Sequence, residues 1–338
     1  MSESKNRVVL VLGATGYIGG HVARAAHQAG WRVRALRRRP GATGNIGDLP
    51  VEWHEGDIDR PSSLVHALRG VDVVLHAAGY YPRAGGRVAD HVGKGVRQTR
   101  DVLEACRQAE VRKVVYTSTL TTVGPPPRDA ARLADERDLY LPGSLPTAFY
   151  YECKYAMEGE ALRFCAGGLP LVVLNPTAVL GPGDSTPTLG GVILAAARGR
   201  GWAWLEAEVN IVDVRDVAQA HVAAVERGES GQRYLIGGHN LTVREAMDRL
   251  AAVAGVPPPR VHIPLAMIGA AAWVSDRLPA LSLLGNHLHA IRHWQGYDTS
   301  RAREKLGLSP RPLEETLRDM LEEYVARGWL PRKPIVVG

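Results

Sequence analysis

The chain of 338 residues is long enough for one large α/β domain with a smaller lobe, and it can bury a full core without disulfides or a structural metal. Its 41 Lys and Arg and 35 Asp and Glu give a net charge of +6, and much of the excess lies in one arginine-rich run at residues 32–39. Charge elsewhere alternates in sign, which argues against nucleic acid as a partner. The three cysteines are odd in number and lack metal-type spacing, which excludes a disulfide framework and suits a reducing cytosol.

The N-terminal residues 1–7 are polar and run directly into an apolar segment, without the length or flanks of a signal peptide, so we expect a cytoplasmic protein. The longest apolar stretch, 263–274, is too short for a membrane span of about 20 residues. It predicts a buried or interfacial helix and no transmembrane segment.

Apolar runs of strand length alternate with helical patterns up to Pro176. Strands are predicted at 8–12, 32–36, 73–77, 114–117 and 171–174, and helices at 17–29, 61–68 and 96–109. Because each crossover is expected to be right-handed, this series predicts an α/β fold with a Rossmann-type doubly wound parallel sheet.

After Pro176 the alternation gives way to stretches rich in Pro and Gly. Residues 209–212 and 234–236 look like late strands that return to the first sheet. We therefore expect a nucleotide-binding domain of residues 1–176 plus 209–238, and a smaller, discontinuous substrate lobe of residues 177–208 plus 239–330.

A glycine-rich loop, Gly13-Ala14-Thr15-Gly16-Tyr17-Ile18-Gly19, follows the first strand directly and opens the first helix. Glycines here permit a tight turn and let the backbone and the helix N-terminus approach a pyrophosphate, while Gly19 lets helix and sheet pack closely. A glycine-rich turn without a ligand is the alternative. The strand before and the helix after favour a dinucleotide site.

The end of the second strand reads Leu36-Arg37-Arg38-Arg39, where a fold that binds a ribose diol places Asp or Glu. With guanidinium groups at Arg37 and Arg38 for a 2′-phosphate, NADP is favoured over NAD as cofactor, and a solvated basic face is the alternative. Asp57 lies where a third strand would end. It is a candidate for the adenine amino group and, equally, an ordinary turn residue.

Tyr150 and Lys154 stand four residues apart, so on a helix they share a face and the ammonium can favour the ionised phenol. A phenol that exchanges its proton near neutral pH is a general acid/base beside a nicotinamide. Packing is the alternative role for a helical Tyr, and Tyr151 is the rival phenol, although residue 155 is Tyr rather than Lys. The pair predicts an enzyme that moves a hydride and a proton together.

Together these motifs resemble the extended short-chain dehydrogenase/reductase family over about residues 7 to 240. The closer similarity is to dihydroflavonol-reductase-like and 3β-hydroxysteroid-dehydrogenase-like proteins, including hopanoid-associated sugar epimerases. The resemblance rests on the order of these segments: the loop at Gly13, His76-Ala77-Ala78-Gly79, Tyr116-Thr117-Ser118-Thr119, the Tyr150/Lys154 pair, Asn175-Pro176-Thr177, Gly181-Pro182-Gly183 and 212–218.

The resemblance implies roles for several residues. Tyr150 would be the general acid/base, Lys154 would hold the nicotinamide ribose and lower the pKa of the phenol, and Thr119 would hydrogen-bond the reacting oxygen, with Ser118 as the alternative. Further cofactor contacts are implied at Ile58, Ala77, Ala78, Gly79, Thr117, Ser118, Asn175 and Pro176. It also implies a homodimer formed by helices near residues 96–109 and 150–166.

The chain departs from the family pattern at two places. Gly95-Val96-Arg97-Gln98-Thr99 stands where many members have Asn-Val-x-Gly-Thr, so any relay that depends on that Asn is in doubt. Asn175-Pro176 replaces the Arg-Pro of many sugar-nucleotide enzymes, and this resembles the reductase side of the family.

Loops after parallel strands line the ligand crevice, so residues 79–82 and 183–188 are expected to face the nicotinamide. Candidates for the substrate wall are Tyr80, Tyr81, Thr119, Pro187, Thr188 and Trp202, with Trp204 beside them. Aromatic core packing is the alternative. His287, His289 and His293 lack a repeating acidic partner, and no metal is expected.

The leading function is therefore an NADP-dependent oxidoreductase that reduces a ketone or oxidises a secondary alcohol, a small-molecule carbonyl or alcohol substrate. One alternative is a nucleotide-sugar epimerase or dehydratase that uses a retained NAD(P). Another, of a different class, is a regulatory protein that senses NADP without chemistry, although such proteins usually lose the Tyr/Lys pair.

Overall fold

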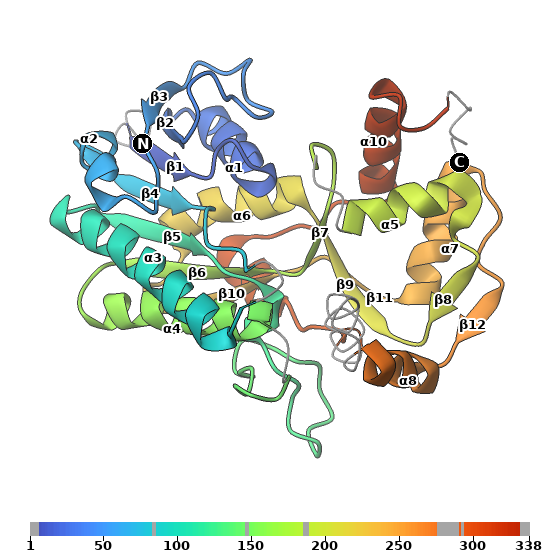
Figure 1. The fold of residues 1–338 in the computed structure, drawn as a ribbon. Helices are drawn as coiled ribbons and strands as arrows, with labels where there is room; N and C mark the ends of the chain where they lie inside the picture. The colour runs from blue at the N-terminus through green and yellow to red at the C-terminus, as the bar shows by residue number, and fades with distance from the viewer. Residues whose placement is uncertain are drawn as a thin grey trace.

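The main sheet has seven parallel strands. The computed structural model describes residues 7–82, 86–145, 149–184, 189–275, 291 and 294–331. The strands run in the order β10-β6-β5-β4-β1-β2-β3 (Figure 1). They are β1 (Val8–Leu12), β2 (Arg32–Arg37), β3 (Glu52–Glu55), β4 (Val73–His76), β5 (Lys113–Thr117), β6 (Leu171–Pro176) and β10 (Arg233–Ile236). This order confirms the predicted doubly wound α/β fold.

Both faces of the sheet are covered, which is why its strands read as continuous apolar runs. Val9 and Val11 of β1 pack in one core with α1 (Tyr17–Gln28) and α6 (Val214–Arg227). Leu10 and Leu12 point to the opposite face and pack with α2 (Leu64–Leu68), α3 (Val88–Gln108) and α4 (Phe149–Ala166).

The predicted helices are present, with changed boundaries. The segment 61–68 is a 3₁₀ turn, η2 (Pro61–Ser63), followed by α2. Helix α3 begins at Val88, well before the predicted Val96. Val88, Val92 and Val96 are spaced four residues apart, so the apolar pattern of this helix already begins at Val88.

The second lobe contains two small sheets and its own core. One sheet has the order β11-β9-β7, and the other pairs β12 with β8. The strands are β7 (Ala178–Leu180), β8 (Ala203–Leu205), β9 (Glu208–Asp213), β11 (His239–Thr242) and β12 (Val261–Ile263). The helical elements of this lobe are α5 (Leu189–Ala195), η4 (Ala196–Arg200), α7 (Val243–Ala254), α8 (Leu265–Ser275) and α10 (Leu313–Ala326). The element η6 (Ala302–Leu306) packs instead in the core with α1 and α6.

Of the two late strands that were predicted to join the main sheet, one lies in a different sheet. β10 does join the main sheet beside β6, as predicted for 234–236. Residues 209–212 instead belong to β9, which pairs antiparallel with β11 and parallel with β7. β9 serves both cores, because Val212 packs with α1 and α6 while Ile211 packs in the second lobe. An apolar run cannot show which sheet a strand joins, so the domain boundaries drawn from it stay a prediction.

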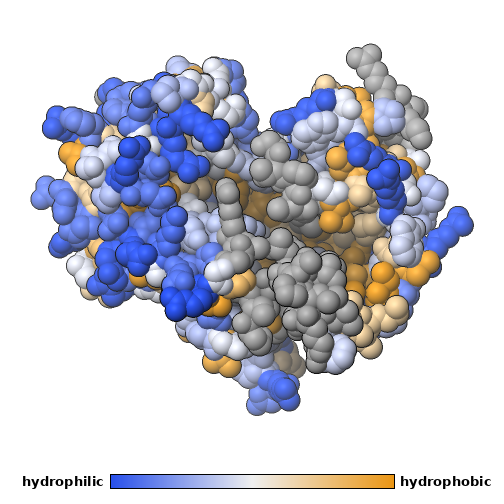
Figure 2. Space-filling view, in the orientation of Figure 1, coloured by the Kyte–Doolittle hydropathy of each residue, from blue (hydrophilic) through white to orange (hydrophobic). Residues whose placement is uncertain are grey.

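The apolar stretch 263–274 forms α8, as a helix was predicted there. Ile268 is buried, whereas Met267 and Trp273 are 62% and 58% exposed. Figure 2 shows that this face of the molecule is strongly hydrophilic over the nucleotide-binding part and more apolar over the second lobe. Across the described ranges, no helix combines the length and apolarity that crossing a bilayer requires.

Candidate active site

The loop between β1 and α1 is shaped by glycines that no other residue could replace without a clash. Gly13 has a φ of +90°, and a Cβ there would lie 2.7 Å from the carbonyl oxygen of Ala77. A Cβ on Gly19 would lie 2.1 Å from the carbonyl oxygen of Gly13. The loop therefore lies against the end of β4, and α1 starts beside it with no acidic residue in its first turn.

A cleft of about 760 Å³ opens from this loop along the carboxyl ends of the strands. It brings together many of the predicted site residues, namely Gly13, Thr15, Gly16, Arg38, Asp57, Ile58, Ala77, Ala78, Gly79, Tyr80 and Tyr81. The lining contains the glycine loop at Gly13 and Gly16 and also the guanidinium of Arg38. This arrangement fits a dinucleotide whose pyrophosphate lies at the N-terminus of α1.

The two predicted arginines behave differently. Arg37 is held outside the cleft lining, with its guanidinium 3.6 Å from the carboxylate of Glu55 and 5.3 Å from the ring centroid of Trp53. Arg38 is exposed and lines the cleft, close to Asp57. Of the two, Arg38 is therefore the one placed to meet a phosphate.

Several other predicted cofactor residues are occupied elsewhere. The hydroxyl of Tyr17 donates to the carbonyl of Gly181 at 3.1 Å, and Ile18 packs against the core. Thr117 Oγ1 lies 2.7 Å from Nε2 of His221, whose pKa burial lowers to about 4. Asn175 and Pro176 are buried in β6. None of these side chains is part of the described cleft lining, so their predicted cofactor contacts would be left to backbone atoms.

The Tyr150/Lys154 pair lies on the first turns of α4, next to the cleft residues Gly79 and Tyr81. The Lys154 Nζ is 5.7 Å from the centroid of the Tyr150 ring, and a Cβ added at Gly79 would lie 3.5 Å from that nitrogen. The side chain of Thr119 interacts with the Tyr150 phenol, and the ring centroid of Tyr81 lies 5.0 Å from that of Tyr150. The three predicted catalytic side chains thus lie close together, beside the cleft lining.

Burial dominates the pKa values of this group. It raises the pKa of Tyr150 to about 12, and the interaction with Thr119 offsets only part of that rise. Burial also lowers the pKa of Lys154. That Lys154 lowers the pKa of the phenol, as the resemblance implies, stays a prediction.

The hydroxyl expected as the alternative to Thr119 has a different environment. Ser118 Oγ is buried and makes no hydrogen bond within the described part of the chain. Thr119 carries the contact with the phenol, so the geometry favours Thr119 over Ser118.

The substrate side is only partly described. The Tyr80 hydroxyl lies 2.7 Å from Nδ1 of His91, and Tyr81 is 61% exposed at the cleft mouth. Trp202 is exposed beside β8 and is not part of the cleft lining, while Trp204 stacks on His262 at 4.4 Å. Pro187, Thr188, His287, His289 and His293 lie outside the described residues. Among the described residues, no group of three or more His, Cys, Asp or Glu could hold a metal ion.

Sequence reasoning missed Lys94, Gln98 and Asp59, which also line the cleft. Gln98 Nε2 donates to Asp59 Oδ1 at 2.6 Å. Gln98 stands where the family pattern has Gly, so the departure was visible in the sequence. The sequence could not show that Gln98 meets Asp59, because the two residues are 39 positions apart and come together only in the folded chain.

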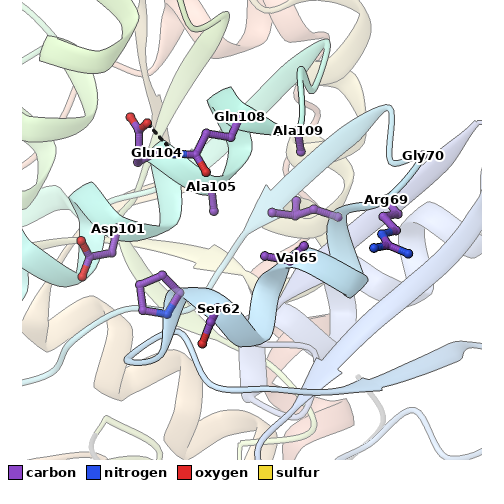
Figure 3. Close-up of a pocket in the computed structure, with 11 residues that line it drawn as sticks. Ser62, Val65, Arg69, Gly70, Asp101, Glu104, Ala105, Gln108 and Ala109 are labelled. Atoms are coloured by element: carbon purple, nitrogen blue, oxygen red, sulfur yellow. Dashed lines mark hydrogen bonds between the residues drawn. The ribbon is translucent and has the colours of Figure 1, made fainter.

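A second cavity, of about 610 Å³, lies between α2 and α3 (Figure 3). Its lining includes Val65 and Leu68 of α2 and Asp101, Glu104 and Gln108 of α3. None of its lining residues is a predicted site residue, and the Tyr150 group is not part of it. The cleft along the strand ends is therefore the candidate active site.

A parallel sheet with a glycine turn over a helix N-terminus, and a Tyr/Lys pair beside it, defines the class of nicotinamide-dinucleotide-dependent enzymes. Residues 9–237 match the NAD dependent epimerase/dehydratase family, and the chain belongs to that family. It is thus an NAD(P)-dependent extended short-chain dehydrogenase/reductase.

Three similar proteins illustrate the range of this family. The chain is 31% identical to the sterol demethylase protein B of Methylococcus capsulatus, over 95% of this chain and 99% of that one. It is 29% identical to the dihydroflavonol 4-reductase of Zea mays, over 71% and 72% of the two chains. The crystal structure of a nucleoside-diphosphate-sugar epimerase from Pseudomonas aeruginosa superposes with a TM-score of 0.80 at 29% identity, over 96% of this chain and 99% of that one.

Proposed function

We propose that the protein is an NADP-dependent oxidoreductase that reduces a ketone, or oxidises a secondary alcohol, of a small molecule. The observation that carries this proposal is the position of the Tyr150 phenol, which interacts with Thr119, has the Lys154 ammonium 5.7 Å from its ring centroid and packs against Tyr81 of the cleft lining. The similarity to a dihydroflavonol 4-reductase supports a simple carbonyl reduction.

The chemistry divides among three side chains. Tyr150 donates a proton to the carbonyl oxygen, and the hydroxyl of Thr119 hydrogen-bonds the same oxygen. Lys154 reaches past Gly79 to hold the nicotinamide ribose. When bound, the dinucleotide supplies the hydride. Burial keeps the pKa of Tyr150 high, so the phenol carries the proton that it donates in the reduction.

The other end of the cleft supplies the contacts that hold the dinucleotide. The backbone of the loop from Gly13 to Gly16 receives the pyrophosphate at the start of α1. Arg38 would pair with the 2′-phosphate, and this is the ground for preferring NADP. Asp57 would accept from the adenine amino group, although its Oδ1 already accepts from the amide of Asp59 at 3.1 Å.

The test is NADPH oxidation measured with a panel of ketones. We expect turnover with the wild type and a loss of about 100-fold or more in kcat for Tyr150→Phe. Tyr151→Phe is the matched control, because that neighbouring ring packs against Tyr140 at 5.6 Å and not on the cleft, so its kcat should stay within about twofold. No turnover with any ketone, or full activity in Tyr150→Phe, would overturn the proposal.

A second candidate is a nucleotide-sugar epimerase or dehydratase, which the similarity to the Pseudomonas aeruginosa epimerase favours. Such an enzyme oxidises and re-reduces one substrate on a retained cofactor and consumes no net NADPH. A dinucleotide that stays bound through purification, together with binding of a nucleoside diphosphate sugar, would select it. A non-catalytic sensor is disfavoured, since the Tyr150/Lys154 pair is retained.

We also propose a homodimer through α3 and α4. These two helices pack side by side on the outer face of the sheet (Figure 1). Light scattering after size-exclusion chromatography should give twice the 36.5 kDa chain mass, and a monomer at micromolar concentration would contradict the proposal.

A further inference from the structure

A buried ion pair lies beneath the catalytic group. Glu158 of α4 and Arg233 of β10 are only 3% and 7% exposed. Arg233 Nε lies 2.6 Å from Glu158 Oε1, although this N–H is not aligned for a hydrogen bond. Removing two charges from water is costly, and apolar residues of similar volume often stabilise a fold as well or better. Stability alone therefore does not account for this pair.

The carboxylate of Glu158 joins elements that are far apart in the sequence. Its Oε2 accepts from the hydroxyl of Thr122 in η3 (Leu120–Thr122) and from the amide of Asn175 in β6, both at 2.7 Å. The Thr122 hydroxyl in turn accepts from Arg233 Nη2 and from Asn175 Nδ2, both at 2.9 Å. One buried network thus ties α4 to the chain after β5 and to two strands of the sheet.

This network holds Thr119 through its carbonyl and holds the helix that carries Tyr150. Asn175 Nδ2 also donates to the carbonyl of Thr119 at 3.2 Å, so it fixes the residue whose side chain meets the Tyr150 phenol. On α4, Tyr150, Lys154 and Glu158 are spaced four residues apart and share one helix face. Glu158 therefore fixes the helix on one side of the contact, and Thr119 is fixed on the other.

We propose that Glu158 and Thr122 are positioning residues, which set the separation between the Tyr150 phenol and Thr119 so that both reach one carbonyl oxygen. This inference rests on the proposed function. Neither Glu158 nor Thr122 is among the described residues that line the cleft. Asn175, which the sequence suggested as a cofactor contact, serves here as the bridge between them. A shift of about 1 Å at such a contact costs on the order of 100-fold in rate.

The experiment compares Thr122→Val with Thr122→Ser. Valine keeps the shape but removes the hydroxyl, whereas serine keeps the hydroxyl. We expect Thr122→Val to lower kcat per NADPH-binding site roughly 10- to 100-fold and Thr122→Ser to stay within about threefold of wild type. The Kd for NADPH, measured by fluorescence titration, should change by less than about twofold in both. A purely structural loss would lower the number of binding sites and leave kcat per site unchanged.

Glu158→Gln is the second variant, and it should also lower kcat per site at an unchanged Kd. Glu160→Gln is its matched control. Glu160 is also buried on α4, at 7% exposure, but it pairs with Arg100 and Arg163 on another face of the helix. We expect Glu160→Gln to lower Tm while kcat per site stays within about twofold. If Glu158→Gln does not fold, the threonine pair decides.

The proposal is overturned if Thr122→Val keeps its kcat per site, or if Glu160→Gln loses as much as Thr122→Val. Tyr150→Phe is measured alongside to distinguish a failure of the positioning role from a failure of the proposed function. An inactive Tyr150→Phe with a fully active Thr122→Val removes the positioning role and leaves the proposed function intact. A wild type without turnover removes both.

Discussion

The two ends of the cleft are built in different ways. At the nucleotide end, backbone sterics fix the shape, as Gly13 against the carbonyl of Ala77 shows. At the chemical end, side chains from α4, the chain after β5 and two strands hold Tyr150 and Thr119 in contact through buried hydrogen bonds. We therefore expect dinucleotide binding to depend on local backbone conformation, and catalysis to depend on contacts between residues distant in sequence.

In the proposed function Lys154 serves both cofactor binding and catalysis, so its removal should give the largest effect. Lys154→Met removes a charge that faces Gly79 and lies beside the Tyr150 ring. We expect kcat to fall on the order of 100-fold and the Kd for NADPH to rise about 10-fold. Stopped-flow single turnovers and fluorescence titration measure the two separately. A change in only one of them would show that Lys154 belongs to one end alone.

Gly13→Ala should break the nucleotide end. The new Cβ would meet the carbonyl of Ala77 at 2.7 Å at a φ of +90°, so the loop must move. Losing one or two hydrogen bonds to a charged pyrophosphate, at about 1.5–3 kcal/mol each, corresponds to roughly 100-fold weaker NADPH binding.

Gly30→Ala is the control for backbone strain alone. Gly30 also has a positive φ, of +81°, but a Cβ there meets nothing within 4 Å. It should cost about 1–2 kcal/mol of unfolding free energy and leave the Kd for NADPH unchanged. Equal Kd values for the two alanine variants would contradict the steric explanation.

Arg38→Gln tests which arginine at the nucleotide end meets the 2′-phosphate. Because Arg38 lines the cleft, its loss should reduce the preference for NADPH over NADH by about 10- to 100-fold, through a higher Kd for NADPH. Arg37→Gln is matched to it, since Arg37 is engaged by Glu55 and Trp53. Its preference should change by less than about twofold, and the reverse order would assign the phosphate to Arg37.

Features that depend on local sequence could be predicted, whereas contacts between residues distant in sequence could not. The glycine loop, the alternation of strands and helices up to Pro176 and the spacing of Tyr150 and Lys154 were predictable because each depends on local sequence. The sheet that β9 joins was not, since its alternating residues serve two cores. Nor was the burial of Asn175 with Glu158, because side chains 17 residues apart meet only after β6 and α4 have packed.

The smallest effect concerns the buried histidines that flank the sheet. Burial lowers the pKa of His76 and of His221 to about 4. A His whose pKa is depressed in the folded state stabilises the fold above its unfolded pKa of about 6.5, and this stability is lost as pH falls from 6.5 towards 4. Chemical denaturation should therefore show a lower free energy of unfolding at pH 5 than at pH 7. His221→Phe should reduce that loss, and an unchanged loss would exclude His221 as a source.

The central claim is that Tyr150 gives the proton while the dinucleotide gives the hydride in the same turnover. The most direct measurement is the transfer of deuterium to a ketone substrate from NADPH that carries deuterium at both C4 positions of the nicotinamide, followed by mass spectrometry in a single turnover. We predict one deuterium in the alcohol product of the wild type and a transfer at least about 100-fold slower in Tyr150→Phe. Product without deuterium, or an equal rate in Tyr150→Phe, would contradict the account.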